Sequence, residues 1–342
     1  MVKSLVERVE KGSILTRAQA DEIMDELLSG RVETPEIVRL LSALNTRPFQ
    51  LEEVVGFARA MRRHAAPVFP EGQDRPKNMV DTCGTGGDRA KMFNVSTAAA
   101  IVAAAAGARV AKHGNRRSDG VGSGSADVLE ALGVRIDAPV EHAGRAIREI
   151  GIGFLFARSA HAAARHAAPA RKQIGARTVF NLLGPLTNPA GAQHQVLGVF
   201  SEEIIELMAA ALAELGVERA FVVRGAGGIG EFSLAGETLV AEVKKGTIQY
   251  YAVTPEDFGV SRAPLDSLVS GTAAENAARI RRIFEGESGP ARDIVVANAA
   301  AALIAAGAAA NFREGAKLAA AAISSGAAEN KLAALVEFTL KS

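Results

Sequence analysis

The stretch DTCGTGGDRAKMFNVSTAAA, residues 81–100, joins an apolar run to an alanine-rich segment through a turn with three glycines. The apolar residues MVDTC at 79–83 are typical of a buried strand, and NVSTAAA at 94–100 is typical of a helix start. A strand that ends in a glycine turn before a helix presents free amide N–H groups and the positive end of the helix dipole. We therefore expect an anion to bind at this junction.

The residues around the turn leave alternatives open. Ser96 and Thr97 are common N-cap residues, so their hydroxyls either close the helix or face a phosphate or its metal ion. An ordinary glycine-rich turn before a capped helix explains the same pattern. The turn is not a Walker A loop, because Asp88 follows Gly87 without the lysine that this motif requires, and it lacks the G-x-G-x-x-G pattern of dinucleotide-binding folds.

Outward from this stretch, residues 78–342 alternate short β-type runs with longer helical segments. This alternation predicts a mainly parallel central sheet surrounded by helices, with a small antiparallel edge at 237–255 and helices again at 272–341. Residues 1–70 carry leucine and valine at helical spacing, and the Pro- and Gly-containing segment 67–76 is a linker. The predicted fold class is α/β, with a small N-terminal all-helical domain at 1–70 and a larger α/β domain at 78–342.

Composition excludes several classes of protein. Lys and Arg total 39 against 38 for Asp and Glu, a net charge of +1, so no overall field attracts nucleic acid or an anionic membrane. Cys83 is the single cysteine, which excludes a disulfide framework and suits a reducing, cytoplasmic location. The first ten residues contain no apolar signal-peptide core, and the longest apolar tracts are alanine-rich and interrupted, as in interior helices.

A second polar segment, KHGNRRSDGVGSGSAD at 112–127, follows the next predicted strand. Because neighbouring parallel strands end at the same rim of a sheet, its cationic run and the glycine turn are expected to lie together. This combination suits a ligand with several phosphates. Taken singly, Lys112 is also explained as a solvated charge and His113 as a structural hydrogen-bonder.

The motifs DTCGTGGD, FNVST, AKHGNR, GSADVLEALGV, GFLFA, RTVFNLLGPLTNPA and VLGVF occur in the order found in the anthranilate phosphoribosyltransferases. The chain resembles this family, which acts in tryptophan biosynthesis and is related to pyrimidine nucleoside phosphorylases, over nearly its whole length. RTVFNLLGPLTNP is the most specific segment. The resemblance implies a cleft between the two domains, a helical segment near 165–190 that joins the helical domain, and a homodimer formed through that domain.

The resemblance also implies the chemistry. The family transfers the phosphoribosyl group of 5-phosphoribosyl 1-diphosphate (PRPP) to the amino group of anthranilate and releases diphosphate, with Mg²⁺ as cofactor. Lys112 and Arg171 are the implied catalytic residues, one at the leaving diphosphate and the other at the anthranilate carboxylate. Ser96 and Glu231 are the implied metal ligands. The implied PRPP-binding residues are Gly84, Thr85, Gly86, Gly87, Asp88, Asn94, Ser96, Thr97, Lys112, Arg116 and Ser118, and the implied anthranilate-binding residues are Gly84, His113, Asn115, His161, Arg171, Gly184 and Pro185.

Three departures from the family pattern keep other functions open. Gly230 replaces the usual aspartate before Glu231, and Arg224 replaces a common histidine. The loop after Asn115 carries an extra residue, so Arg116, Arg117 and Ser118 are candidates for phosphate contacts and Asp119 for the missing carboxylate. The alternatives are a paralogue with another aromatic acceptor, a nucleoside phosphorylase-like enzyme, against which RTVFNLLGPLTNP and Arg171 argue, and a non-catalytic PRPP-binding protein.

Overall fold

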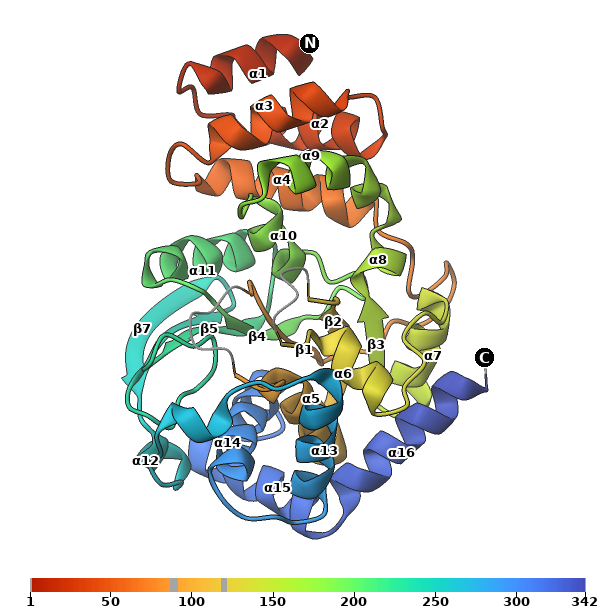
Figure 1. Cartoon of the computed structure of the whole chain (residues 1–342), viewed down its shortest axis with the longest axis vertical. Coiled ribbons are helices and arrows are strands. Elements are labelled where there is room, and N and C mark those ends of the chain that lie inside the picture. Colours follow the sequence, from red (N-terminus) through yellow and green to blue (C-terminus); the bar gives the residue numbers. More distant parts are fainter. Residues whose placement is uncertain (1, 87–91, 118–121, 342) are drawn as a thin grey trace.

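The computed structural model describes residues 2–86, 92–117 and 122–341. A smaller helical part stands above a larger part built on a twisted sheet (Figure 1). The first four helices form most of the smaller part, and two later helices, α9 and α10, return to pack against α3 and α4. The helices of the smaller part are α1 (Val2–Glu10), α2 (Arg17–Leu28), α3 (Thr34–Leu44), α4 (Leu51–Arg63), α9 (Ala168–Ile174) and α10 (Phe180–Leu186).

Apolar side chains on one face of each helix form the core of the smaller part. Phe57, Leu27 and Leu40 are fully or almost fully buried there, with Leu183 from α10 in the same cluster. Burial of such side chains contributes about 1.5–3 kcal/mol each, which is what holds short helices together. The smaller part therefore has a core of its own that includes residues from the middle of the chain.

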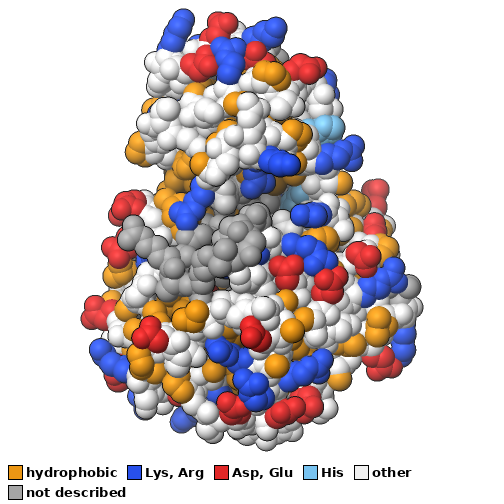
Figure 2. Space-filling model, in the orientation of Figure 1, with side chains coloured by type: hydrophobic (Ala, Val, Ile, Leu, Met, Phe, Trp, Pro, Cys, Tyr) orange, Lys and Arg blue, Asp and Glu red, His pale blue; other side chains and the backbone are white. Residues whose placement is uncertain are grey.

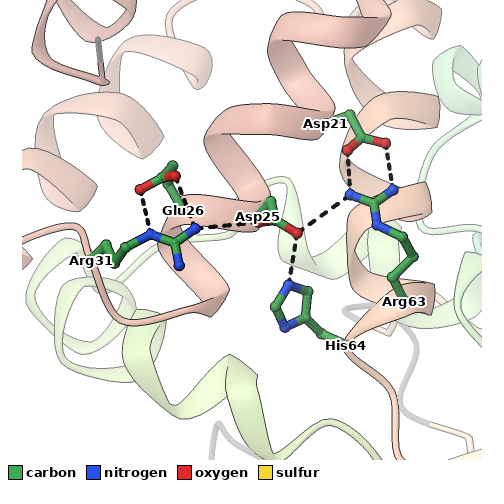
Figure 3. Close-up of polar contacts among 6 residues, drawn as sticks. All are labelled: Asp21, Asp25, Glu26, Arg31, Arg63 and His64. Carbon is green, nitrogen blue, oxygen red and sulfur yellow. Dashed lines mark hydrogen bonds and ion pairs between the residues drawn. The ribbon is translucent and has the colours of Figure 1, made fainter.

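Ion pairs fasten the end of α4 to α2 (Figure 3). His64 Nε2 lies 2.9 Å from Asp25 Oδ1, and the guanidinium of Arg63 pairs with Asp21. Arg31 pairs with Glu26 at 2.7 Å and reaches Asp25 at 3.4 Å. These pairs are largely exposed, so each contributes at most about 1 kcal/mol, but together they fix where the chain leaves the helical part.

Seven strands form one sheet in the order β3-β2-β1-β4-β5-β6-β7. The five strands from β3 to β5 are parallel, and β6 and β7 form an antiparallel edge. Both the parallel sheet and the antiparallel edge were predicted from the sequence, and the α/β fold class is confirmed. The strands are β1 (Met79–Gly84), β2 (Arg109–Gly114), β3 (Ile152–Phe156), β4 (His194–Gly198), β5 (Arg219–Gly225), β6 (Thr238–Lys244) and β7 (Thr247–Val253).

Helices cover both faces of the sheet. On one face, α5 and α14 pack closely because their contact is made largely of alanines, which allow two helices to approach. The opposite face meets α10, α11 and the smaller helical part. The remaining helices are α5 (Val95–Ala105), α6 (Ser125–Ala131), α7 (Val140–Glu149), α8 (Ala157–Ala160), α11 (Ile205–Glu214), α12 (Pro255–Phe258), α13 (Ala273–Phe284), α14 (Pro290–Ala305), α15 (Phe312–Ser324) and α16 (Ala327–Leu340).

The strand order changes direction between β1 and β4. From β1 the chain moves outward through β2 to β3, and it then returns to place β4 on the other side of β1. Ligands of open α/β sheets bind where the order reverses, at the carboxyl ends of the strands. None of the described helices is long and apolar enough to cross a bilayer.

Candidate active site

The strands β1 and β4 end side by side, and each ends in a glycine, Gly84 and Gly198. Thr85 N donates to the carbonyl of Gly198 at 2.9 Å, and Phe200 N donates to Thr85 Oγ1 at 3.1 Å. A β-carbon on Gly198 would overlap the carbonyl oxygen of Gly230, so the segment before Glu231 packs directly on β4. Gly86 has φ of 67°, a conformation that favours glycine. The described part of the predicted turn, residues 84–86, is therefore fixed at the switch point, where Gly84 and Gly86 are exposed.

The start of α5 follows this turn, and the side chain of its N-cap residue forms no hydrogen bond with the backbone amides of the first turn. Asn94 makes no capping hydrogen bond; its side chain instead bonds to Ser123 O at 3.0 Å and accepts from Ser123 Oγ at 2.8 Å and Asn276 Nδ2 at 3.0 Å. Thr97 Oγ1 is buried and has no hydrogen-bond partner among the described residues. Val95 N and Thr97 N already bond to Phe93 O and Asn94 O, so the positive end of the α5 dipole and the buried Thr97 hydroxyl are the groups that remain to attract an anion; anion binding here stays a prediction.

Lys112 lies next to β1 on the α5 side of the sheet. Its Nζ donates to the carbonyl oxygen of Thr82 and lies 3.3 Å from Thr82 Oγ1, while Thr82 Oγ1 donates to Ser96 O at 2.9 Å. Burial lowers the pKa of Lys112, and the charges of Asp81 and Glu231 act in the opposite direction. The ammonium is therefore held beneath the turn, close enough to Glu231 for their charges to interact.

Two neutral histidines meet on the other face of the sheet. The rings of His113 and His161 lie edge to face with centroids 5.1 Å apart. The His113 ring bonds to the backbone carbonyl of Gly184, and the His161 ring bonds to that of Thr187. Burial lowers the pKa of His113 to about 3 and that of His161 to about 4. Both rings are neutral at pH 7, and within the described parts of the chain neither Nε2 has a hydrogen-bond partner.

Asp81 and Asn188 hold this pair in place, and sequence reasoning did not select either of them. Asp81 Oδ1 accepts from His113 N at 3.1 Å, and its Oδ2 accepts from Asn188 Nδ2 at 2.9 Å. Asn188 Nδ2 also donates to Ala111 O at 2.7 Å. Burial raises the pKa of Asp81. The available signal was an acidic residue inside the apolar run MVDTC, because a buried carboxylate needs partners.

Two further acceptor-side residues come later in the sequence: Arg171 follows His161, and Gly184 lies against His113. The Arg171 guanidinium lies 5.1 Å from the ring centroid of Phe180, and among the described residues it forms no ion pair. A β-carbon on Gly184 would meet no atom within 4 Å, so open space lies beside it. Pro185 follows inside α10 and is buried. The structure therefore places His113, His161 and Gly184 in direct contact, and Arg171 on the helix that precedes α10.

Other predicted residues have different surroundings. The guanidinium of Arg116 pairs with Asp127 at 3.0 Å and Glu130 at 2.8 Å on α6, so in this structure it serves α6, and its phosphate role stays a prediction. Asn115 is exposed, and its Oδ1 accepts from Arg116 N at 2.9 Å. Gly87, Asp88, Ser118 and Asp119 lie outside the described residues.

The magnesium ligands likewise stay a prediction. No group of three His, Cys, Asp or Glu side chains is placed to hold a metal ion in the part of the chain that is described. Magnesium bound to a phosphate substrate takes most of its ligands from phosphate and water, so one or two protein oxygens suffice. Arg224, at the position of a common histidine, donates from Nη1 to Val199 O at 3.0 Å.

The face in Figure 2 shows several Lys and Arg side chains bordering the junction between the helical part and the larger part. Residues 3–65 match the helical bundle domain of a glycosyl transferase family, and residues 76–329 match its a/b domain. An anthranilate phosphoribosyltransferase of Pelotomaculum thermopropionicum is 48% identical over 339 residues, covering 99% of this chain and 97% of the relative. This chain belongs to the anthranilate phosphoribosyltransferase family.

Solved structures of anthranilate phosphoribosyltransferases have the same fold. The enzyme of Thermus thermophilus is 47% identical, with a TM-score of 0.91 over 98% of this chain and 99% of that chain. The enzyme of Saccharomyces cerevisiae in complex with PRPP and Mg is 26% identical, with a TM-score of 0.89 over 100% of this chain and 98% of that chain. The resemblance stated from the motifs is thus confirmed at the level of the family.

Proposed function

We propose that this protein transfers the 5-phosphoribosyl group of PRPP to the amino group of anthranilate and releases diphosphate, as a step of tryptophan biosynthesis. The observation that carries the proposal is the glycine turn at the β1–β4 switch point, in a chain that matches anthranilate phosphoribosyltransferases over nearly its full length. The neutral histidine pair and the guanidinium of Arg171, which forms no ion pair with a described residue, support it from the acceptor side.

Breakage of the bond to diphosphate places negative charge on the leaving group. The exposed backbone of Gly84 and Gly86 and the positive end of the α5 dipole are fixed before the reaction and stabilise that charge as it develops. The ammonium of Lys112, held at the Thr82 carbonyl, adds positive potential beneath the same turn. These interactions strengthen as the transition state forms, which is the condition for lowering a barrier.

The acceptor side needs a different environment. The amino group of anthranilate attacks as the neutral amine, so a strong base is unnecessary. Neutral imidazoles whose Nε2 has no partner among the described residues suit an N–H donor. Arg171 binds the acceptor carboxylate through charge-assisted hydrogen bonds. Positioning of the two substrates then accounts for most of the rate. Asn115, Gly184 and Pro185 complete the proposed acceptor site.

Magnesium is the proposed cofactor, with Ser96 and Glu231 as its protein ligands. The hydroxyl of Ser96 in the first turn of α5 and the carboxylate of Glu231, whose charge acts on Lys112, are oxygen groups of the type that Mg²⁺ binds. Magnesium, when bound with PRPP, supplies positive charge at the diphosphate oxygens. Arg116 and residues 87, 88 and 118 complete the proposed PRPP contacts. We further propose a cytoplasmic homodimer formed through the helical domain, with domains at 1–70 and 78–342.

The test is the loss of anthranilate fluorescence on mixing the protein with PRPP and Mg²⁺, with diphosphate release measured in parallel. Consumption of anthranilate with equal diphosphate release supports the proposal. PRPP turnover only with another aromatic amine indicates a paralogue. Release of a nucleobase that depends on phosphate indicates a nucleoside phosphorylase. PRPP binding by calorimetry without turnover of any acceptor indicates a non-catalytic binding protein.

A further inference from the structure

A cavity of about 510 Å³ opens at the edge of the sheet opposite the switch point. Gln193, which lines it, immediately precedes β4 and accepts from Met79 N, the first residue of β1, at 3.0 Å. Leu215 and Val217 line it from the connection between α11 and β5. The cavity therefore lies towards the amino ends of the central strands, and Pro185 and Asn188 form the wall that it shares with the acceptor side of the candidate active site.

Two arginines and no acidic residue line this cavity within the described chain. Arg62, near the end of α4, donates from Nε to Leu186 O at 2.8 Å and from Nη1 to Leu215 O at 3.1 Å. Its other N–H groups have no acceptor among residues 2–86, 92–117 and 122–341. An arginine held by two carbonyls keeps its full charge, because carbonyl oxygens are neutral.

Arg75, in the linker between the two parts, supplies the second guanidinium. It lies directly against Gly191, at the place where a β-carbon would overlap it. Gly191 has φ of 61°, so glycine both permits this turn and leaves room for the guanidinium. Arg75 is exposed and forms no ion pair with a described residue. The cavity is thus open to solvent on its Arg75 side.

The positive charges of Arg62 and Arg75 repel each other. Burial, followed by the charges of Arg75 and Arg59, lowers the pKa of Arg62 to about 10. Arg75 keeps much of its surface in solvent, and partial burial of the rest lowers its pKa. Two positive charges in a partly desolvated cavity repel each other, which raises the free energy of the folded protein. An anion bound between them removes this repulsion and accepts hydrogen bonds from the N–H groups that have no other acceptor. Planar guanidinium groups bind tetrahedral oxyanions through paired hydrogen bonds.

We propose that the cavity between Arg62 and Arg75 is a binding site for a dianionic, phosphate-type oxyanion, distinct from the proposed diphosphate site at the β1–β4 switch point and bordered by Pro185 and Asn188 of the acceptor side. Two guanidiniums match a dianion in charge, and the cavity has room for a phosphate together with a small esterified group. The proposal rests on the cavity and its charges and does not depend on the transferase activity.

The test uses the full chain as the parent protein, Arg75→Gln and the control Arg109→Gln. Arg109 lies exposed at the start of β2, on the same edge of the sheet but outside the cavity lining. Arg62 is unsuitable as the test position, because its loss also removes the bonds to Leu186 and Leu215. Thermal unfolding is followed while inorganic phosphate is titrated against sodium chloride at equal ionic strength, and a second series uses glycerol 2-phosphate.

We expect the parent and Arg109→Gln to gain the same saturable rise in Tm with phosphate. Arg75→Gln should lose part of that rise, because phosphate should bind to the cavity of this variant with a Kd weaker by about tenfold to a hundredfold. Any phosphate bound at the active site contributes equally to all three proteins. A response to glycerol 2-phosphate identifies a monoester as ligand, and a response to inorganic phosphate alone identifies the free ion.

Equal phosphate responses in the parent and Arg75→Gln would overturn the proposal, as would equal stabilisation by chloride, and the cavity would then be a solvated crevice only. A crystal soaked in sulfate gives an independent answer. Density for sulfate between Arg62 and Arg75 is expected, and density only at the start of α5 contradicts the site.

Discussion

Replacement of Arg171 by alanine separates binding of the acceptor from folding of the protein. The guanidinium has no ion pair among the described residues, so its removal strands no buried charge. Its contact with the ring of Phe180 is worth about 0.5–1 kcal/mol, which sets the expected loss of unfolding free energy. A hydrogen bond to a charged group contributes about 1.5–3 kcal/mol, so the KM for anthranilate should rise roughly tenfold to a hundredfold.

The assay is the rate of anthranilate fluorescence loss at saturating PRPP and Mg²⁺, over a range of anthranilate concentrations. Arg171→Lys should fall between the parent and Arg171→Ala, because an ammonium keeps the charge but loses the two-pronged geometry. Lys172→Ala is the matched control, since Lys172 is the next residue on α9 and is also exposed. A KM for anthranilate within twofold of the parent value in Arg171→Ala would remove this residue from the acceptor site. The KM for PRPP should not change.

Three further changes test the metal site, the histidines and the helical core. Gly230→Asp adds a carboxylate beside Glu231 and should lower the Mg²⁺ concentration for half-maximal activity; unchanged dependence would place the missing ligand elsewhere. His113 has a pKa of about 3 when folded and 6.5 as its reference value, so the unfolded chain binds the proton first and stability is lost as pH falls from about 6.5 towards 3. His113→Gln should reduce the fall of the urea midpoint over this pH range, and His166→Gln is the control. If the urea midpoints of the two variants fall equally with pH, the assignment is contradicted. Arg47→Met leaves the fully buried carboxylate of Glu53 with only the Leu15 N–H, 3.0 Å away, and should cost about 3–5 kcal/mol of unfolding free energy. A loss no larger than that of the exposed pair in Arg39→Met, below about 1 kcal/mol, would show that the ion pair is dispensable.

Local patterns in the sequence carried enough information for the fold. The run MVDTC and the four later apolar runs became parallel strands, because continuous apolar residues of that length suit a sheet covered on both faces. Residues 237–255 alternate more strongly, and they form the antiparallel edge, where β7 has exposed positions such as Tyr250. The sequence shows the glycine turn itself, but its place at the switch point follows from the pairing of β1 with β4, which lies far along the chain.

Pairings between distant residues could not be predicted in the same way. Arg116 lies in a cationic run that suited phosphate, yet its guanidinium pairs with Glu130 one helix later, and charge counting does not reveal such partners. The contact between His113 and His161 joins β2 to the end of α8. The arginine-lined cavity brings together α4, the linker, the segment before β4 and part of the motif LLGPLTNPA, and the two arginines themselves lie outside any motif.

The alternation of side chains along β2 explains how one strand serves two opposite chemical needs. Lys112 and His113 are consecutive, so they point to opposite faces of the sheet. Lys112 lies on the α5 side with Thr82 and supplies positive charge beneath the amides proposed to hold diphosphate. His113 lies on the side of α10, where burial keeps it neutral beside the proposed site of the amine. A cation at the position of His113 would oppose the positive charge that forms on the ribose carbon as diphosphate leaves, whereas the charge of Arg171 is proposed to be neutralised by the acceptor carboxylate. A shift of the β2 register by one residue would exchange the two groups, and the pairing of Lys112 with Phe154 and of His113 with Leu155 on β3 fixes that register.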